Sequence, residues 1–326
     1  MKRKYLLAKN WPSDKARVEI ARETAQQILI HKKNLIRGYV IEERFDNLLA
    51  NYAEFESEIL ARSLNNLLHR PRTDVQYHEI RIALSRRIMN LLSSCRAYFD
   101  QSSKRIKAAF GSKELGAIKK ACSKEYDSSF SYRLMEVLRN QSQHVGSASD
   151  DSSVMNTVTR RGKNPCIAST VTPRLVKKRL MEDPRACSKL AGDLPSQPDV
   201  IDLTGHVRSY MDSIIRIHSA TRELLSQGYQ EWEATIEDAI LTYRSHAGSE
   251  NEPIGLTLFV VQDLGSLSVV EKEPIFRGLI ERRTYLEKRN TVVPDLSRFF
   301  VTGQEPHLIE TADVGLAPSV RNPGKD

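Results

Sequence analysis

Cysteine is scarce in this chain, and the few cysteines are not arranged for a metal site. Only four occur in 326 residues, at Cys95, Cys122, Cys166 and Cys187, and no two of them form a Cys-x-x-Cys pair. Structural zinc sites and disulfide frameworks need closely spaced cysteines, whereas scattered thiols suit a reducing compartment. We therefore expect a cytoplasmic protein without a disulfide framework, a bound metal or another cofactor.

Long apolar runs are also missing. No stretch approaches the roughly 20 apolar residues of a membrane-spanning helix. The chain begins Met-Lys-Arg-Lys, but the apolar run that follows ends before Lys9, which is too short for a signal peptide. The sequence therefore predicts no association with a membrane.

Several familiar catalytic motifs are absent as well. The sequence contains no Gly-x-Gly-x-x-Gly, no phosphate-binding P-loop, no His-Glu-x-x-His and no Gly-x-Ser-x-Gly. These patterns mark dinucleotide-binding enzymes, P-loop nucleotide hydrolases, zinc proteases and α/β-hydrolases. Their absence narrows the enzyme classes that fit the chain without excluding an enzyme.

Apolar residues and positive charge are both present in quantity. Hydrophobic residues make up 40% of the chain and charged residues 28%, with a net charge of +8. The apolar content supports a buried core, and the basic balance favours a polyanionic partner.

Apolar residues recur every three or four positions through the first half of the chain, which is the pattern of helices that bury one face. It predicts five helices, over residues 13–37, 40–69, 75–110, 113–123 and 128–145. Between them the sequence offers no convincing strand. We therefore predict an antiparallel helical bundle over residues 1–146.

Beyond residue 146 the composition changes, and short runs rich in β-branched residues appear. We expect an exposed loop at 147–153, strands at 154–159, 166–171, 255–261 and 266–270, and helices at 174–181, 204–245 (straight or hinged at Gly228) and 273–289. The predicted fold class is mainly α, with an N-terminal antiparallel helical bundle and a C-terminal α+β region of long helices and short β hairpins. The predicted segments are the bundle at 1–146, a loop and small β connection at 147–203, a helical α+β region at 204–302 and a flexible tail at 303–326.

Three polar side chains gather near the end of the predicted helix 128–145. At about 100° per residue, Asn140 and His144 are neighbours one turn apart, and Arg139 lies beside Asn140. A fixed cation, an amide and a titratable base therefore share one arc of the helix end. This arc is the main indication of chemistry in the sequence.

The run Arg-Asn-x-x-x-His at the end of the last bundle helix resembles the HEPN superfamily, whose motif is an arginine followed four to six residues later by a histidine. The wider run Tyr132-Arg-x-Met-x-x-Leu-Arg-Asn-x-x-Gln-His-x-Gly146 resembles a group of bacterial proteins with such a bundle. In that group a proline often follows the glycine, whereas this chain has Ser147 and Ala148. The resemblance covers roughly residues 10–146.

The resemblance implies a metal-independent endoribonuclease of the toxin or defence type, with RNA as its substrate, a homodimer as its working form and an antitoxin protein as a further partner. Cleavage of RNA by its own 2′-hydroxyl needs a proton acceptor, a proton donor and positive charge on the transition state. His144 would act as acid or base, Arg139 would bind the non-bridging oxygens with its guanidinium fork, and Asn140 would orient either. Because one copy supplies one histidine, a two-fold dimer would complete the site.

Structural interpretations compete at each of these positions. His144 can cap the helix C-terminus, where a cation is favoured, and Arg139 can pair with Glu136. The chain would then be a non-catalytic helical scaffold or partner-binding protein. His218 lies on the apolar stripe of 204–245, where we expect a core histidine with satisfied hydrogen bonds, and we place Tyr229 and Trp232 in the core as well.

Overall fold

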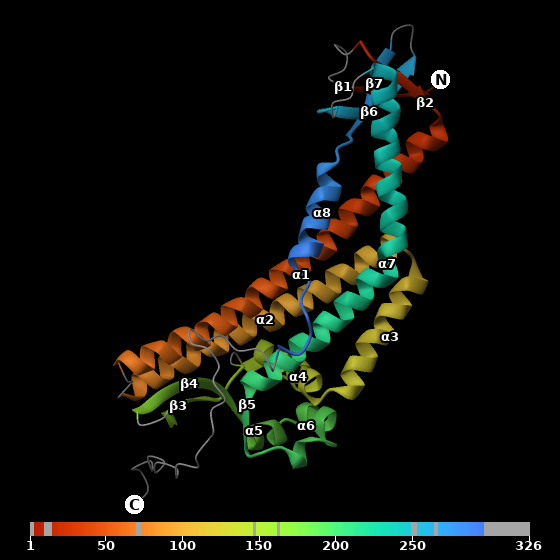
Figure 1. Cartoon of the computed structure of the whole chain (residues 1–326). Coiled ribbons are helices and arrows are strands. Elements are labelled where there is room, and N and C mark those ends of the chain that lie inside the picture. The colour runs from red at the N-terminus through yellow and green to blue at the C-terminus, as the bar shows by residue number, and fades with distance from the viewer. Residues whose placement is uncertain are drawn as a thin grey trace, which may run out of the picture. The chain divides into compact units, whose positions relative to one another are not determined.

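Eight α-helices and seven strands form within the part of the chain that the computed structural model describes, which is residues 3–9, 15–69, 73–145, 148–161, 164–248, 253–263 and 267–296. The helices are α1 (Arg22–His69), α2 (Asp74–Ala109), α3 (Ser112–Ser128), α4 (Phe130–Val145), α5 (Lys177–Glu182), α6 (Pro184–Leu190), α7 (Leu203–Ala247) and α8 (Gly278–Arg289). The strands are β1 (Arg3–Lys9), β2 (Val18–Ile20), β3 (Asp151–Arg161), β4 (Asn164–Val176), β5 (Val200–Asp202), β6 (Leu256–Asp263) and β7 (Leu267–Pro274). The prediction of a mainly α chain with short antiparallel sheets is confirmed (Figure 1).

The chain divides into two compact units, and each unit is built from segments that are far apart in the sequence. The first unit contains Met1–Asn51, Leu91–Tyr132 and Met211–Pro294. The second contains Tyr52–Asn90, Arg133–Tyr210 and the residues after Pro294. α1, α2 and α7 therefore each contribute to both units. The segment boundaries that we predicted from composition, at residues 146, 203 and 302, stay predictions.

In the first unit, α1 and α2 run antiparallel. The guanidinium of Arg37 donates to the carbonyl of Ala108 over 3.1 Å, and the rings of Phe45 and Tyr98 lie 6.0 Å apart between centroids. Later residues of α1 therefore contact earlier residues of α2, as in two antiparallel helices. A helical hairpin of this kind buries one apolar stripe of each helix against the other.

α7 packs antiparallel to α1 in the same unit, and the ring of Tyr229 on α7 lies against Gly38 of α1. A Cβ atom at this position would lie 2.3 Å from Cε1 of Tyr229, well inside van der Waals contact. The tyrosine ring of α7 fills the space that a larger side chain would need, which explains why a glycine stands at this helical position. The two predicted helices 13–37 and 40–69 are in fact one helix, α1, which begins at Arg22 and passes through Gly38 without a break.

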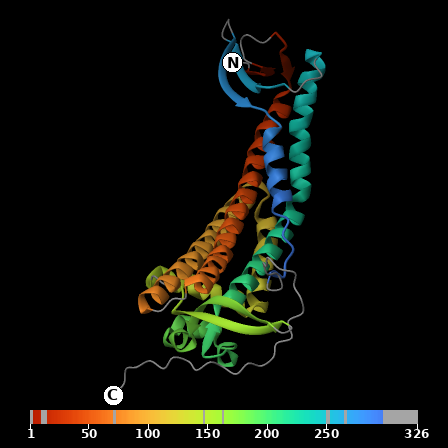
Figure 2. The same ribbon diagram turned by 60° about the vertical axis from the view of Figure 1, so that its left-hand side comes forward.

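The third long helix of this unit is continuous as well. Gly228 lies in the middle of α7, which runs from Leu203 to Ala247 without a hinge. A Cβ atom at Gly228 would lie 2.5 Å from Cε1 of Phe110, so this glycine also makes room for an aromatic ring. α8 lies alongside α1 and α7 (Figures 1 and 2). The guanidinium of Arg283 on α8 donates to the carboxylate of Glu233 on α7 over 2.7 Å.

A four-stranded antiparallel sheet completes the first unit, in the order β2-β1-β6-β7. The register places Leu6 of β1 opposite Phe259 of β6, and these two residues form a buried cluster with Ala8 and Val261. The prediction of an all-helical N-terminus was wrong here, because β1 and β2 were missed. β1 pairs with β6, which follows it by about 250 residues in the sequence. A local sequence pattern cannot identify a pairing partner at that distance.

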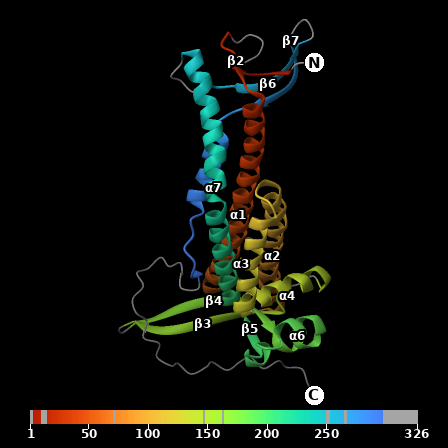
Figure 3. The ribbon, with the colours of Figure 1, turned by 90° about the vertical axis from the view of Figure 1, so that its right-hand side faces the viewer.

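The second unit holds the remainder of the α1–α2 hairpin, α4 and a three-stranded antiparallel sheet in the order β3-β4-β5 (Figure 3). α1 reaches the β3–β4 hairpin through polar groups. The hydroxyl of Ser63 accepts from the amide of Val171 over 3.2 Å, and the amide of Asn66 donates to Asn156 and Ser169 over 2.8 and 2.6 Å. The predicted β hairpin is therefore present and is fixed to α1 by hydrogen bonds.

Three local predictions in this unit were wrong. Ala148 and Ser149 are each only 1% exposed, so the described part of the predicted exposed loop 147–153 is largely buried, and Ala148 donates its amide to the hydroxyl of Ser85. The predicted helix 174–181 begins only at Lys177, because β4 continues to Val176. The predicted loop and small β connection 147–203 also contains the helix α6, where Pro184 occupies a first-turn position. The predicted tail 303–326 lies outside the described residues.

Candidate functional site

α4, which carries the predicted motif, is held by one buried face. Leu134, Val137 and Leu138 are all at most 3% exposed, as their helical spacing predicts. The helix begins after Ser129, whose hydroxyl accepts from the amide of Tyr132 over 3.1 Å. The N-terminal cap of α4 is therefore Ser129.

Arg139 is engaged by its own helix. Its guanidinium forms an ion pair with the carboxylate of Glu136 over 2.6 Å and donates to the Asn140 side chain over 3.2 Å. The phenol of Tyr210 donates to the same carboxylate over 3.2 Å. Both members of the ion pair are mostly covered, with the side chains of Arg139 and Glu136 exposed by 14% and 18%.

The structure therefore brings two of the three predicted site residues into direct contact. Arg139 and Asn140 are joined by a hydrogen bond. His144 lies in the last turn of α4, and its side chain is outside the part that the structure describes. The roles of Arg139, Asn140 and His144 in a reaction stay a prediction.

The same helix also anchors the segment around α6. Arg133 forms an ion pair with Asp193 over 2.7 Å, and Gln141 donates to Asp183 over 2.8 Å. Asp183 is the N-cap of α6, where it accepts from the amide of Arg185. The hydrogen bonds from Gln141 and from this amide lower the pKa of Asp183. α4 thus works as an attachment point for the elements that follow it.

A second polar cluster, which the sequence did not reveal, lies in the core of the first unit. Glu42 of α1 and His218 of α7 are each 1% exposed. The phenol of Tyr98 lies 2.8 Å from Nδ1 of His218, whose Nε2 lies 3.3 Å from the carboxylate of Glu42. Arg222 binds the carboxylate from the other side, with a shortest distance of 2.6 Å. We call Glu42, Tyr98, His218 and Arg222 the buried network.

The hydrogen bonds of the buried network assign the proton on His218. A phenol donates to Nδ1, so Nε2 carries the hydrogen that is donated to Glu42, and the imidazole is neutral. Burial lowers the pKa of His218, which agrees with the neutral form. Burial opposes ionisation of Glu42, but hydrogen bonds from His218 and Arg222 outweigh it and lower its pKa to about 2. Glu42 is therefore a carboxylate paired with the Arg222 cation.

The buried network is suited to structure rather than to turnover. Its acid and its histidine are sealed from solvent, and the imidazole stacks on Phe45 with the ring centroids 3.7 Å apart. The prediction of a core histidine at position 218 is confirmed, and so is the core placement of Tyr229 and Trp232, each 5% exposed. Glu42 could have been suspected from the sequence, because it interrupts an apolar helical stripe.

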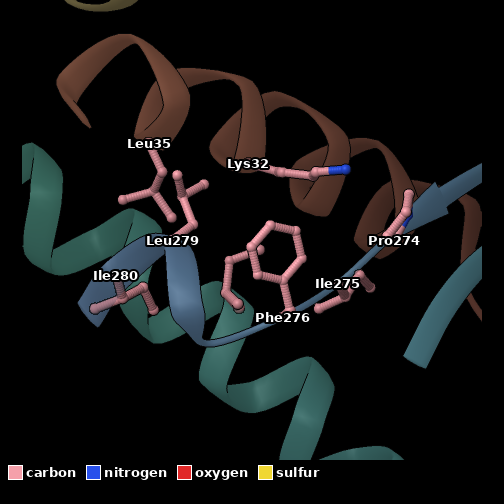
Figure 4. A pocket seen from close by; sticks show the side chains of 8 residues that line it. Lys32, Leu35, Pro274, Ile275, Phe276, Leu279 and Ile280 are labelled. Atoms are coloured by element: carbon pink, nitrogen blue, oxygen red, sulfur yellow. The ribbon is translucent and has the colours of Figure 1, made fainter. Parts of the chain in front are cut away.

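The cavity between α1, α7 and the segment that joins β7 to α8 is too small for a ligand. Figure 4 shows its apolar wall, to which Leu35, Ile275 and Leu279 contribute. Its volume is about 10 Å³, which is the size of a single water site. Lys32 at its edge is paired with Glu273 over 2.5 Å.

The described residues contain neither a candidate metal site nor a membrane-spanning helix. No group of three or more histidine, cysteine or acidic residues is placed to hold a metal ion there. No helix in that part of the chain is both long enough and apolar enough to cross a membrane. Comparisons of the chain with protein-family models, with curated proteins and with solved structures gave no match.

Proposed function

We propose that this protein is a helical scaffold that associates with a second copy of itself through an exposed leucine stripe on α1. The stripe consists of Leu60, Leu64, Leu67 and Leu68, which are 45%, 58%, 44% and 67% exposed. Isolated apolar residues are common on protein surfaces, but four neighbouring leucines are rarely exposed to solvent on one helix. This stripe is the observation that carries the proposal.

The spacing of the stripe suits a two-fold contact. Leu60, Leu64 and Leu68 follow one another at four-residue steps and so form a single ridge along the helix. Ridges of this kind pack into the grooves between the ridges of a facing helix. When two copies cross antiparallel at Leu64, Leu60 of one lies toward Leu68 of the other, so the ridge complements itself as an isologous interface requires.

The interior of the chain supports the scaffold hypothesis. The ionic pairs described above join long helices to one another, and Glu56 of α1 adds a two-armed bond from Arg208 of α7 at 2.8 Å for each arm. Such pairs fix the register between helices more than they add stability. A bundle with fixed registers presents a surface stripe in one geometry, which favours a specific contact.

Replacing Leu64 by glutamate should separate the copies. In the symmetric contact two carboxylates would face each other, and loss of a central apolar contact weakens interfaces by at least about 30-fold. Light scattering during gel filtration should show the wild type near twice the chain mass of 37.1 kDa and Leu64→Glu near the single mass. Ile82→Glu is the control, because Ile82 is 44% exposed on α2 and lies outside the stripe. A wild type that is monomeric at all concentrations would refute self-association.

A second candidate function is the metal-independent ribonuclease, and one observation favours it. Arg139 and Asn140 are hydrogen-bonded to each other on the helix that ends one turn beyond them at His144. The ion pair with Glu136 counts against it, because a guanidinium that binds a carboxylate is not free to bind phosphate. Under this hypothesis Glu136 must release Arg139 when RNA arrives.

Purified protein should then cleave single-stranded RNA in EDTA and leave a 2′,3′-cyclic phosphate. His144→Ala should lower the rate by about 10²–10⁴-fold, the usual contribution of a positioned acid or base. Arg139→Lys should be nearly as harmful as Arg139→Ala, because lysine keeps the charge but loses the fork. His246→Ala is the matched control, since His246 lies in the last turn of α7. Equal cleavage by wild type and His144→Ala would identify a contaminating nuclease, and no cleavage by either would leave the scaffold hypothesis.

A further inference from the structure

An open hollow lies in the first unit, where β1 passes the start of α1. Its volume is about 560 Å³, and its lining consists of residues 3–5 of β1, residues 19–20 of β2, Ala21 and Arg22. We call it the N-terminal hollow. Pockets that bind small molecules span about 300–1,000 Å³, so its size is suitable for a small ligand.

Strand pairing explains why the hollow forms at this place. Tyr5 of β1 is opposite Ile20 of β2, and β2 ends there. Continued by two residues, this register would bring Arg22 opposite Arg3, but the chain turns into α1 at Arg22 instead. Arg3 and Arg22 both line the hollow that forms where the chain turns into α1.

The hollow concentrates positive charge. Its lining contains three cationic residues, Arg3, Lys4 and Arg22, and one acidic residue, Glu19. Within the described residues none of the three cations forms an ion pair. Like charges that share a small space repel one another, and a bound anion would offset that repulsion. Six of the other arginines on α1, α2 and α7 are paired with carboxylates, and Arg222 of the buried network is one of them.

The backbone adds donors on the same side. α1 is 48 residues long, and its first turn begins at Arg22 in the lining of the hollow. The first N–H groups of a helix have no partner within the helix, and the helix dipole favours an anion near them. The two guanidinium forks match the oxygen geometry of phosphate, and the half-buried Tyr5 supplies an aromatic wall beside them.

We propose that the N-terminal hollow binds a small organic phosphate, with Arg3, Lys4 and Arg22 on the phosphate group and the ring of Tyr5 against the organic part. The binding is independent of the leucine stripe and of α4. The carboxylate of Glu19 would turn away from a bound dianion. The ligand class is a phosphate ester that fits about 560 Å³, which distinguishes it from a polymer that tracks along a surface.

Calorimetric titration of the full chain with inorganic phosphate and with pyrophosphate, at constant ionic strength, tests the proposal. We expect one site per chain, with pyrophosphate bound more tightly because it offers more oxygens to the same donors. Arg22→Gln should weaken pyrophosphate binding by about 10-fold or more, since a charge-assisted bond to each anion is lost. Lys4→Gln should weaken it as well. Arg86→Gln, which removes an exposed arginine outside the lining, should leave it unchanged.

Three results would overturn the proposal. The first is no heat of binding for either probe with a wild type whose circular dichroism is that of a folded helical protein. The second is an equal loss of affinity in Arg86→Gln, which would indicate a general effect of net charge. The third is binding of single-stranded RNA without any binding of pyrophosphate, which would identify a polymer surface instead of a site for a small phosphate.

Discussion

Replacing Glu42 by glutamine should destabilise the protein by about 3–5 kcal/mol, the cost of removing one partner from a buried ion pair. The substitution keeps the size of the side chain but leaves the Arg222 cation without its carboxylate and deprives Nε2 of His218 of a charged acceptor. Urea denaturation followed by circular dichroism measures the effect. Glu43→Gln is the matched control, because the half-buried carboxylate of Glu43 accepts a hydrogen bond from the neutral phenol of Tyr39.

The pH dependence of the same variant tests the assignment of charges. The pKa of Glu42 is about 2 in the folded chain against 4.5 ordinarily, so its contribution is complete above about 4.5 and is lost as pH falls toward 2. The stability difference between wild type and Glu42→Gln should therefore shrink over that window. Burial lowers the pKa of His218 below its ordinary 6.5, so wild-type stability should already decline as pH falls below that value. A difference that stays constant down to pH about 2 would contradict a charged Glu42.

A double-mutant cycle separates pairing from burial. Replacing Arg222 by methionine together with Glu42→Leu removes both charges and keeps most of the packing volume. The double variant should recover most of the stability that Glu42→Gln loses, because apolar replacements of buried ion pairs are often neutral or stabilising. A double variant less stable than either single variant would mean that the hydrogen bonds between Glu42 and His218 and from Arg222 to Asn290 outweigh the cost of burying the charges.

Replacing Leu134 by aspartate should be equally severe, with a loss of several kcal/mol and much insoluble protein. Leu134 is 0% exposed on the inner face of α4, so the new carboxylate would be buried without a partner. Thermal unfolding of the soluble fraction measures the effect. Leu241→Asp is the control, because Leu241 is 50% exposed on α7 and the same change of charge and size there leaves the carboxylate in water.

The outcome at Leu134 bears on the function of α4. The helix is anchored by its apolar face and by Arg133, Glu136 and Gln141, which bind other elements of the second unit. A normally folded Leu134→Asp variant would mean that α4 does not depend on that face, and the proposed packing would be wrong. Loss of folding in Leu134→Asp together with normal folding of His144→Ala would separate the structural face of α4 from its motif.

The repeating patterns of the sequence determined the helices and the hairpins. Apolar spacing located α2, α4 and α7 to within a few residues, and β-branched runs located β3, β4, β6 and β7. It also placed Leu134, Leu138 and His218 in the core, because helical periodicity reports which face is buried even when the partner is unknown. We predicted a helix end near Gly38, because the sequence does not distinguish a glycine that ends a helix from one that makes room for a neighbouring helix.

What the sequence could not determine was which segments meet. β1 exists as a strand because β6 lies beside it, and Glu42 is a carboxylate because Arg222 and His218 reach it from 180 and 176 residues away. The sequence left open whether Arg139 pairs with Glu136 or is available to bind a ligand. Residues three and four positions apart on a helix are all neighbours, so their spacing does not select one partner. The folded chain selected Glu136, which Tyr210 holds from α7. Local periodicity records the burial of each residue, whereas the partners of a buried charge or of a strand edge are set only when distant segments pack.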